Sequence, residues 1–189
     1  MTGDRPAGAV RPGPARSRHV VVMGVSGCGK TTVARGISAA TGLAFAEADE
    51  FHSEANVAMM RAGVPLSDTE RWPWLRALAA WVADRAAEGV PTVLACSALK
   101  RAYRDVLRQG APAMEFVHLD GSAAVIRERL SARTGHYMPA SLLDSQIAAL
   151  EPLQPDESGL VLDASRAPDD LVRAAIDGLG LPSDLIVVE

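Results

Sequence analysis

The segment GVSGCGKT at residues 24–31 combines three glycines, a lysine and a threonine at a spacing that suits the binding of phosphate groups. It fits the pattern G-x-x-x-x-G-K-[ST], with an apolar run before it and a helical pattern after it, which is the context that this motif requires. Glycines let backbone N–H groups converge on phosphate oxygens, and the start of the helix adds positive potential. The sequence therefore predicts a site for a nucleoside triphosphate.

Individual residues of this loop have distinct expected roles. Lys30 should reach the β- and γ-phosphates, and the Thr31 hydroxyl should ligate Mg²⁺. Cys28 occupies a variable position of the motif. The residues expected to bind the nucleotide are Gly24, Ser26, Gly27, Cys28, Gly29, Lys30, Thr31 and Thr32.

A carboxylate follows the second expected strand, in the segment FAEADEFH at residues 45–52. Asp49 stands at the carboxyl end of that strand, the edge of a parallel sheet where ligands bind, and should face the phosphate loop. It could accept the proton of an acceptor hydroxyl or hold a metal-bound water. The alternative is that Asp49 caps a helix that begins near Ser53. Glu47 should point to the same face but lie deeper and be less accessible.

Basic residues follow the third expected strand. If CSALKRAYRDVLR is helical, Lys100, Arg104 and Arg108 lie on one face at i, i+4 and i+8. Lys100 and Arg104 could then meet an acidic acceptor, whereas a solvated position is the favoured interpretation for Arg108.

A second pair of cations, Arg129 and Arg133, lies one helical turn apart ahead of a glycine and an interrupted segment. This pattern indicates a lid near residues 127–150. Arginines that close over a triphosphate stabilise charge on the transferring group and expel water.

Other sequence marks favour a kinase over a GTPase switch or a motor ATPase. The base-reading pattern N-K-x-D is absent from the sequence, and the D-x-x-G match at residues 156–159 has no partner motif. The third expected strand ends in VLACSALK without the Asp that motor ATPases generally use to hold Mg²⁺. That metal role must be filled elsewhere or by water.

The elements that must position these residues alternate along the chain. Short apolar runs alternate with segments of helical period, which predicts a doubly wound α/β fold with a parallel five-stranded sheet and a helical lid, similar to nucleoside kinases. The expected strands are 19–23, 43–48, 91–96, 115–120 and 159–164, and the expected helices are about 30–41, 70–88, 98–109, 122–133, 139–150 and 168–179.

Composition narrows the class of protein further. The 189 residues are 48% hydrophobic, which suits one domain at 19–189 after a disordered arm at 1–18. The net charge of −4 argues against a nucleic-acid partner, and no apolar run approaches the roughly 20 residues that span a bilayer. Cys28 and Cys96 suggest neither a disulfide framework nor a zinc site, so we expect a soluble protein of the reducing cytoplasm.

Taken together, the motifs resemble those of the gluconate kinase family of small P-loop kinases. The resemblance runs from His19 to about residue 179, through the segments MGVSGCGKTT, EADEFHSEAN, GVPLSDTERWPWL, CSALKRAYRDVLR and RTGHYMPASLLDSQIAALEPL. It implies phosphorylation of D-gluconate at its 6-hydroxyl with ATP and Mg²⁺, in a cytoplasmic homodimer. It also implies that Asp49, His52, Arg71, Lys100 and Arg104 belong to the acceptor region, and Arg129, Arg133 and His136 to the lid.

Two positions depart from the family pattern, and other functions stay open. Ser53 stands where a proline is usual, and Met59 where a lysine is common, so one positive charge is lost. The cations of the expected rim suit a carboxylate, and no aromatic pair is evident for a nucleobase acceptor. Shikimate or another small hydroxy acid would suit the same cations, and a non-catalytic ATP-binding regulator is the alternative from another class.

Overall fold

The computed structural model describes residues 18–131 and 140–182, which fold around a five-stranded parallel sheet. The strand order is β2-β3-β1-β4-β5, and every neighbouring pair is parallel. The strands are β1 (His19–Met23), β2 (Ala44–Glu47), β3 (Thr92–Ala95), β4 (Glu115–Asp120) and β5 (Gly159–Asp163). The expected fold class is therefore confirmed.

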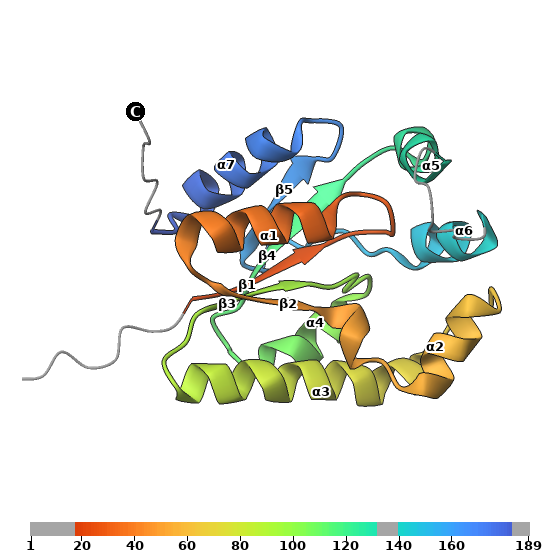
Figure 1. Ribbon diagram of the computed structural model, residues 1–189, viewed down its shortest axis with the longest axis horizontal. Helices are drawn as coiled ribbons and strands as arrows, with labels where there is room; N and C mark the ends of the chain where they lie inside the picture. Colours follow the sequence, from red (N-terminus) through yellow and green to blue (C-terminus); the bar gives the residue numbers. More distant parts are fainter. Residues whose placement is uncertain (1–17, 132–139, 183–189) are drawn as a thin grey trace, which may run out of the picture.

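Helices cover both faces of the sheet. Helices α1 and α7 pack together on one face, and α3 and α4 pack together on the other (Figure 1). The helices are α1 (Lys30–Thr41), α2 (Glu54–Arg61), α3 (Asp68–Ala87), α4 (Arg101–Arg108), α5 (Ala123–Ser131), α6 (Ala140–Ala149) and α7 (Pro168–Leu179), with a 3₁₀ turn, η1 (Ala48–Phe51), after β2. None of the helices in the described ranges is both long and apolar enough to cross a membrane.

The central strand explains why apolar runs predicted this sheet. All five residues of β1 are buried, because β3 and β4 flank the strand and helices cover both of its faces. A strand buried on two sides needs apolar side chains at successive positions, not at alternate ones. The rigid centre of the sheet therefore carries the phosphate loop at the carboxyl end of β1.

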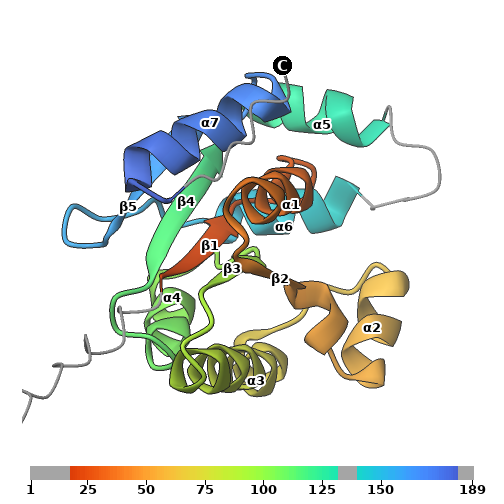
Figure 2. The same cartoon turned by 60° about the vertical axis from the view of Figure 1, so that its left-hand side comes forward.

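Between β2 and α3 lie two short helical segments that the sequence analysis did not delimit. The turn η1 starts directly after β2 and contains Asp49, and α2 follows it. Ser53 caps α2, because its hydroxyl accepts a hydrogen bond from the backbone N–H of Asn56 at 3.2 Å. Figure 2 shows α2 standing apart from α3.

Helix α4 begins three residues later than the expected start at residue 98. Ala98 has a φ of 42°, in the left-handed region, and Lys100 is extended and serves as the N-cap. The chain therefore turns between β3 and α4. Lys100 is not on the helical face that its spacing from Arg104 predicts.

Candidate active site

The phosphate loop, residues 24–31, joins β1 to α1 through backbone conformations that favour glycine. Gly24, Gly27 and Gly29 have φ values of 138°, 85° and 103°. A Cβ on Gly27 would lie 2.7 Å from Cγ of Leu130, so a side chain there would push against α5. The turn brings the loop to the N-terminus of α1, a place that favours anions.

The first two residues of α1 donate hydrogen bonds, one to the phosphate loop itself and one to β2. Lys30 Nζ donates to the carbonyl oxygen of Val25 at 3.0 Å. The Thr31 hydroxyl donates to Glu47 at the end of β2, with 2.7 Å between Oγ1 and Oε2. Burial raises the pKa of Glu47, and the bond from Thr31 opposes that shift. Glu47 therefore lies in the site although no role is expected for it from the sequence; its place at a strand's carboxyl end, two residues before Asp49, is the signal that could have identified it.

A cavity of about 490 Å³ lies beside the phosphate loop. Ser26 and Lys30 contribute to its wall from the loop and α1, Asp49 from η1, and other residues from α2, α3 and α6. In Figure 1, α2 and α6 stand on the same side of the molecule, beyond the carboxyl end of β1. The cavity therefore joins a possible phosphate site to a group of polar side chains.

Asp49 and His52 enter this cavity from the segment after β2. The helix-cap alternative for Asp49 is wrong, because Ser53 supplies the cap of α2. His52 stacks on Trp74 with ring centroids 4.3 Å apart and 14° between the planes. Burial lowers the pKa of His52, Arg71 adds to the effect and Asp49 opposes it. The imidazole is thus favoured in its neutral form, which can both donate and accept a hydrogen bond.

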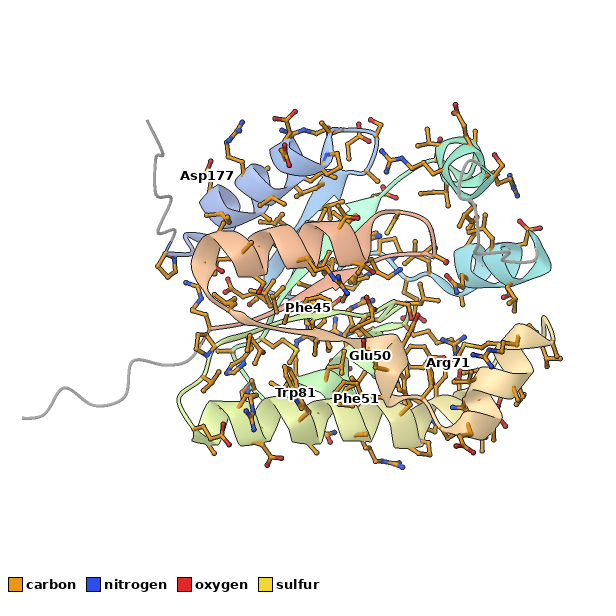
Figure 3. All side chains as sticks on the ribbon, viewed as in Figure 1. Phe45, Glu50, Phe51, Arg71, Trp81 and Asp177 are labelled. Atoms are coloured by element: carbon orange, nitrogen blue, oxygen red, sulfur yellow. The ribbon has the colours of Figure 1, made fainter. Side chains whose placement is uncertain are left out.

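Two arginines line the same cavity, one predicted and one missed. Arg71, in the first turns of α3, donates from Nε to the carbonyl oxygen of Leu66 at 3.1 Å, and its guanidinium lies 5.7 Å from the ring centre of Tyr103. Figure 3 shows it beside α2. Arg61, at the end of α2, also lines the cavity. No motif in the sequence distinguishes Arg61 from an ordinary surface arginine.

Lys100 is engaged with another side chain. Its Nζ lies 2.8 and 3.0 Å from the two carboxylate oxygens of Asp68, and the hydroxyl of Tyr103 donates to the same carboxylate at 2.5 Å. The bond to Asp68 raises the pKa of Lys100. Within the described residues, Lys100 is not part of the cavity wall. Its expected role as a cation facing an acceptor is therefore corrected to that of a partner of Asp68.

Arg104 also differs from the expectation, because it is fully buried. Its guanidinium makes two hydrogen bonds of 2.7 Å to Glu157 and others to the carbonyl oxygens of Ala98, Leu99 and Glu151. The exposed fraction of both charged side chains is 0%. A guanidinium saturated in this way has no donor for a ligand, so we leave Arg104 out of the acceptor site. It ties α4 to the segment before β5.

A smaller cavity, of about 290 Å³, also borders the phosphate loop and shares no wall residue with the larger one. Its wall includes Gly27, Cys28 and Gly29, together with Thr32 and Arg129. Arg129 Nη1 lies 3.4 Å from the carbonyl oxygen of Cys28 and donates to it. Arg129 is thus next to the phosphate loop. Arg133 and His136, the other lid residues named from the sequence, lie outside the described residues.

Comparison with known proteins gives one consistent family. Residues 20–153 match a family model described as an AAA domain. A curated gluconokinase from Gluconobacter oxydans is 45% identical over 161 residues, which cover 85% of this chain and 90% of that protein. The sequence similarity therefore extends over most of this chain.

Solved structures point the same way. A sugar kinase from a Janibacter species, in an unliganded crystal structure, superposes with a TM-score of 0.85 and 60% identity over 87% of this chain and 95% of that one. A gluconokinase from Sinorhizobium meliloti superposes with a TM-score of 0.79 and 43% identity over 87% and 93% of the two chains. At these identities the similarity extends beyond the shared fold.

Proposed function

This chain belongs to the gluconokinase family, and from that premise we propose how its site transfers the γ-phosphoryl group of ATP to the 6-hydroxyl of D-gluconate. The observation that carries the proposal is the single cavity shared by Lys30 of the phosphate loop and Asp49 after β2. A donor held at Lys30 and an acceptor held at Asp49 would meet in that space.

The nucleotide lies across the phosphate loop. Ser26 and Lys30 line the larger cavity, whereas Gly27, Cys28, Gly29 and Thr32 line the smaller one. This division supports a triphosphate with its nucleoside end in the smaller cavity and its γ-phosphoryl group facing the larger. Arg129 contacts the loop on the nucleoside side, and Arg133 is the proposed lid arginine at the transferring group.

Thr31 and Glu47 are the groups that suit Mg²⁺. Thr31 gives its hydroxyl hydrogen to Glu47, which leaves the lone pairs of Oγ1 available to a cation. The ion would neutralise charge on the β- and γ-phosphate oxygens. Glu47 orients the Thr31 hydroxyl and adds negative charge beside it.

The acceptor occupies the larger cavity. Asp49 orients the 6-hydroxyl and takes its proton as the new O–P bond forms and the bond to the β–γ bridging oxygen breaks, which releases ADP. Arg61 and Arg71 face the gluconate carboxylate, and neutral His52 bonds to a hydroxyl of the chain. Lys100, named from its spacing and from the family resemblance, is left out of this geometry because Asp68 holds it, and His136 lies outside the described residues.

The setting of the reaction is also part of the proposal. We take the chain to act as a cytoplasmic homodimer with one kinase domain at 19–189 and a lid near 127–150, on the strength of the family resemblance. Cys28 and Cys96 are both buried and free, which suits a reducing compartment. Neither nucleic acid nor a membrane is a proposed partner.

A coupled ADP-release assay tests the function. The purified chain is assayed with MgATP and D-gluconate, glucose, shikimate and nucleoside monophosphates, and the product is identified by mass and by oxidation with 6-phosphogluconate dehydrogenase. We expect kcat/KM for gluconate to exceed the others by as much as roughly 10⁴, because a site that bonds hydroxyls and a carboxylate rejects ligands that lack them. Preference for shikimate or a nucleotide would overturn the acceptor, and no acceptor-dependent ADP release would favour the regulator.

A further inference from the structure

Helix α6 contacts the phosphate loop through one polar side chain. The backbone N–H of Ser26 donates to Oε1 of Gln146, with 2.7 Å between nitrogen and oxygen. Gln146 is half-buried and lines the larger cavity together with Ser26, Lys30 and Asp49. Helix α6 lies beside the loop between β1 and α1 in both views of the ribbon (Figure 1, Figure 2). The contact therefore lies where donor and acceptor would meet.

Packing fixes the side of α6 that faces the loop. Leu143 is buried in the core, and Ile147 and Leu150 pack against it. Gln146 follows Leu143 by three residues within α6, so the two side chains share one helical face. The segment that follows α6 is also joined to the turn after β3, because the N–H of Glu151 donates to the carbonyl oxygen of Leu99 at 2.8 Å. Gln146 thus contacts the loop from a helix that is packed against the core.

The Ser26 amide belongs to the part of the loop on the acceptor side. Ser26 lines the larger cavity, whereas the next three loop residues line the smaller one. Backbone N–H groups of a phosphate loop bind phosphate oxygens, and the position of Ser26 in the wall of the larger cavity places its N–H on the side proposed for the γ-phosphate. One N–H cannot serve both the Gln146 oxygen and a phosphate oxygen at full strength, so a bound γ-phosphate competes with Gln146.

We propose that Gln146 is a further residue of the phosphoryl-transfer site: its Oε1 holds the Ser26 N–H until a phosphate oxygen takes that donor, and its Nε2 then donates to the same phosphate. A primary amide carries both an acceptor and two donors, and rotation about its last side-chain bond exchanges them with little strain. A carboxylate at this position could hold Ser26 but would repel phosphate. This inference rests on the proposed triphosphate site but not on the identity of the acceptor.

Three variants separate the parts of the proposal. Gln146→Glu keeps the acceptor for Ser26, removes the donor and adds a charge. Gln146→Met keeps the approximate shape and removes both polar groups. Gln109→Glu places the same charge change at an exposed site at the end of α4 and is the matched control. Circular dichroism and thermal melting establish that each variant is folded.

Affinities for MgATP and MgADP are measured by calorimetry without acceptor, and kcat is measured with gluconate. For Gln146→Glu we expect about tenfold or greater loss of ATP affinity, with ADP affinity within about threefold of wild type, because only ATP places a phosphate oxygen at Ser26. For Gln146→Met we expect kcat to fall about tenfold, the effect of losing one hydrogen bond to a charged group. Gln109→Glu should match the wild type.

The outcomes that overturn the inference are distinct from failure of the proposed function. Equal losses for ATP and ADP would mean that Gln146 only supports the loop, and unchanged kinetics in both Gln146 variants would mean that it only packs. If the wild type fails to phosphorylate gluconate but the contrast between ATP and ADP holds, the acceptor is wrong and the inference about Gln146 stands.

Discussion

The Thr31 hydroxyl donates to Glu47 across the gap between α1 and β2, with 2.7 Å between Oγ1 and Oε2. Strand β2 is not a neighbour of β1, because β3 lies between them in the sheet. The carboxylate nearest the proposed metal ligand therefore comes from the strand two places away. Under the proposed function, Glu47 takes the place beside Mg²⁺ that a carboxylate at the end of β3 holds in motor ATPases.

Glu47→Gln should weaken the use of Mg²⁺ without unfolding the protein. The amide oxygen still accepts the bond from Thr31, but the negative charge is lost. We expect the Mg²⁺ concentration for half-maximal activity to rise about 10-fold or more, the effect typical of losing a group that orients a metal ligand. The measurement is a Mg²⁺ titration of kcat at saturating ATP.

The control for this titration is Glu50→Gln, at an exposed neighbouring position that Figure 3 labels. It removes one negative charge from the turn η1 that directly follows β2 but should leave the titration unchanged. If both variants shift the curve equally, general electrostatics and not the contact with Thr31 explains the effect.

Arg104→Met should lower stability much more than it alters substrate binding. Its removal leaves the fully buried carboxylate of Glu157 with fewer partners, although Arg108 still donates to it at 2.7 Å. Breaking a buried pair costs about 3–5 kcal/mol of unfolding free energy, and the remaining bond from Arg108 places the expected loss at the lower end. Urea denaturation measures the loss.

Arg101→Met is the matched control, because its pair with Asp156 is exposed and should add little. The KM for gluconate should be unchanged in Arg104→Met, measured below its melting temperature. If the KM for gluconate rises about tenfold and stability falls little, Arg104 binds the acceptor after all.

The difference between Arg104 and Lys30 shows how far the sequence alone can predict a site. The phosphate loop is predictable because its motif, its strand and its helix are contiguous. Arg104 was assigned from helical spacing, but α4 begins only after the turn at Ala98, and its true partner Glu157 lies 53 residues away. The contact of Ser26 with Gln146 spans 120 residues and leaves no local pattern.

The sheet was more predictable than the acceptor cavity for a related reason. Burial on both faces imposes apolar runs on β1 and β3, whose residues are all buried, so their positions are evident to within a residue or so. The segment from Ala48 to Arg61 has short helices and polar side chains, which give weak periodicity. The positions of Arg61 and His52 in the cavity wall are therefore set by tertiary contacts of this segment and not by a local sequence pattern.

The protein should lose stability in two steps as the pH falls. Burial lowers the pKa of His19, His52 and His118, so the unfolded chain takes up protons first as the pH falls below the ordinary value of about 6.5. The contribution of these neutral histidines to the free energy of unfolding is therefore fully present above pH 6.5 and declines below it. Unfolding free energies at pH 7.5, 6 and 5 should fall in that order, and equal values would contradict the assignment.

The second loss of stability, at lower pH, comes from protonation of Glu157. Burial opposes its ionisation, but hydrogen bonds from Arg104, the backbone of Gln154 and Arg108 together outweigh burial and lower its pKa to about 2. Its contribution is thus present above the ordinary carboxyl value of about 4.3 and is lost as the pH falls toward the folded-state value. A Glu157→Gln variant should lose less stability between pH 5 and pH 3 than the wild type.

Asp49→Asn should lower kcat by roughly 10² or more, because the amide cannot accept the proton of the acceptor hydroxyl. The affinity for ATP should change little, since Asp49 lines the acceptor cavity and not the smaller one on the nucleoside side of the loop. The melting temperature should also hold, because Ser53 and not Asp49 caps α2. Ser53→Ala is the matched control: loss of the cap should lower the unfolding free energy by about 1 kcal/mol and leave kcat near the wild-type value. A variant Asp49→Asn with full turnover and a lowered melting temperature would mean that this carboxylate supports the fold of the segment after β2 and does not take part in transfer.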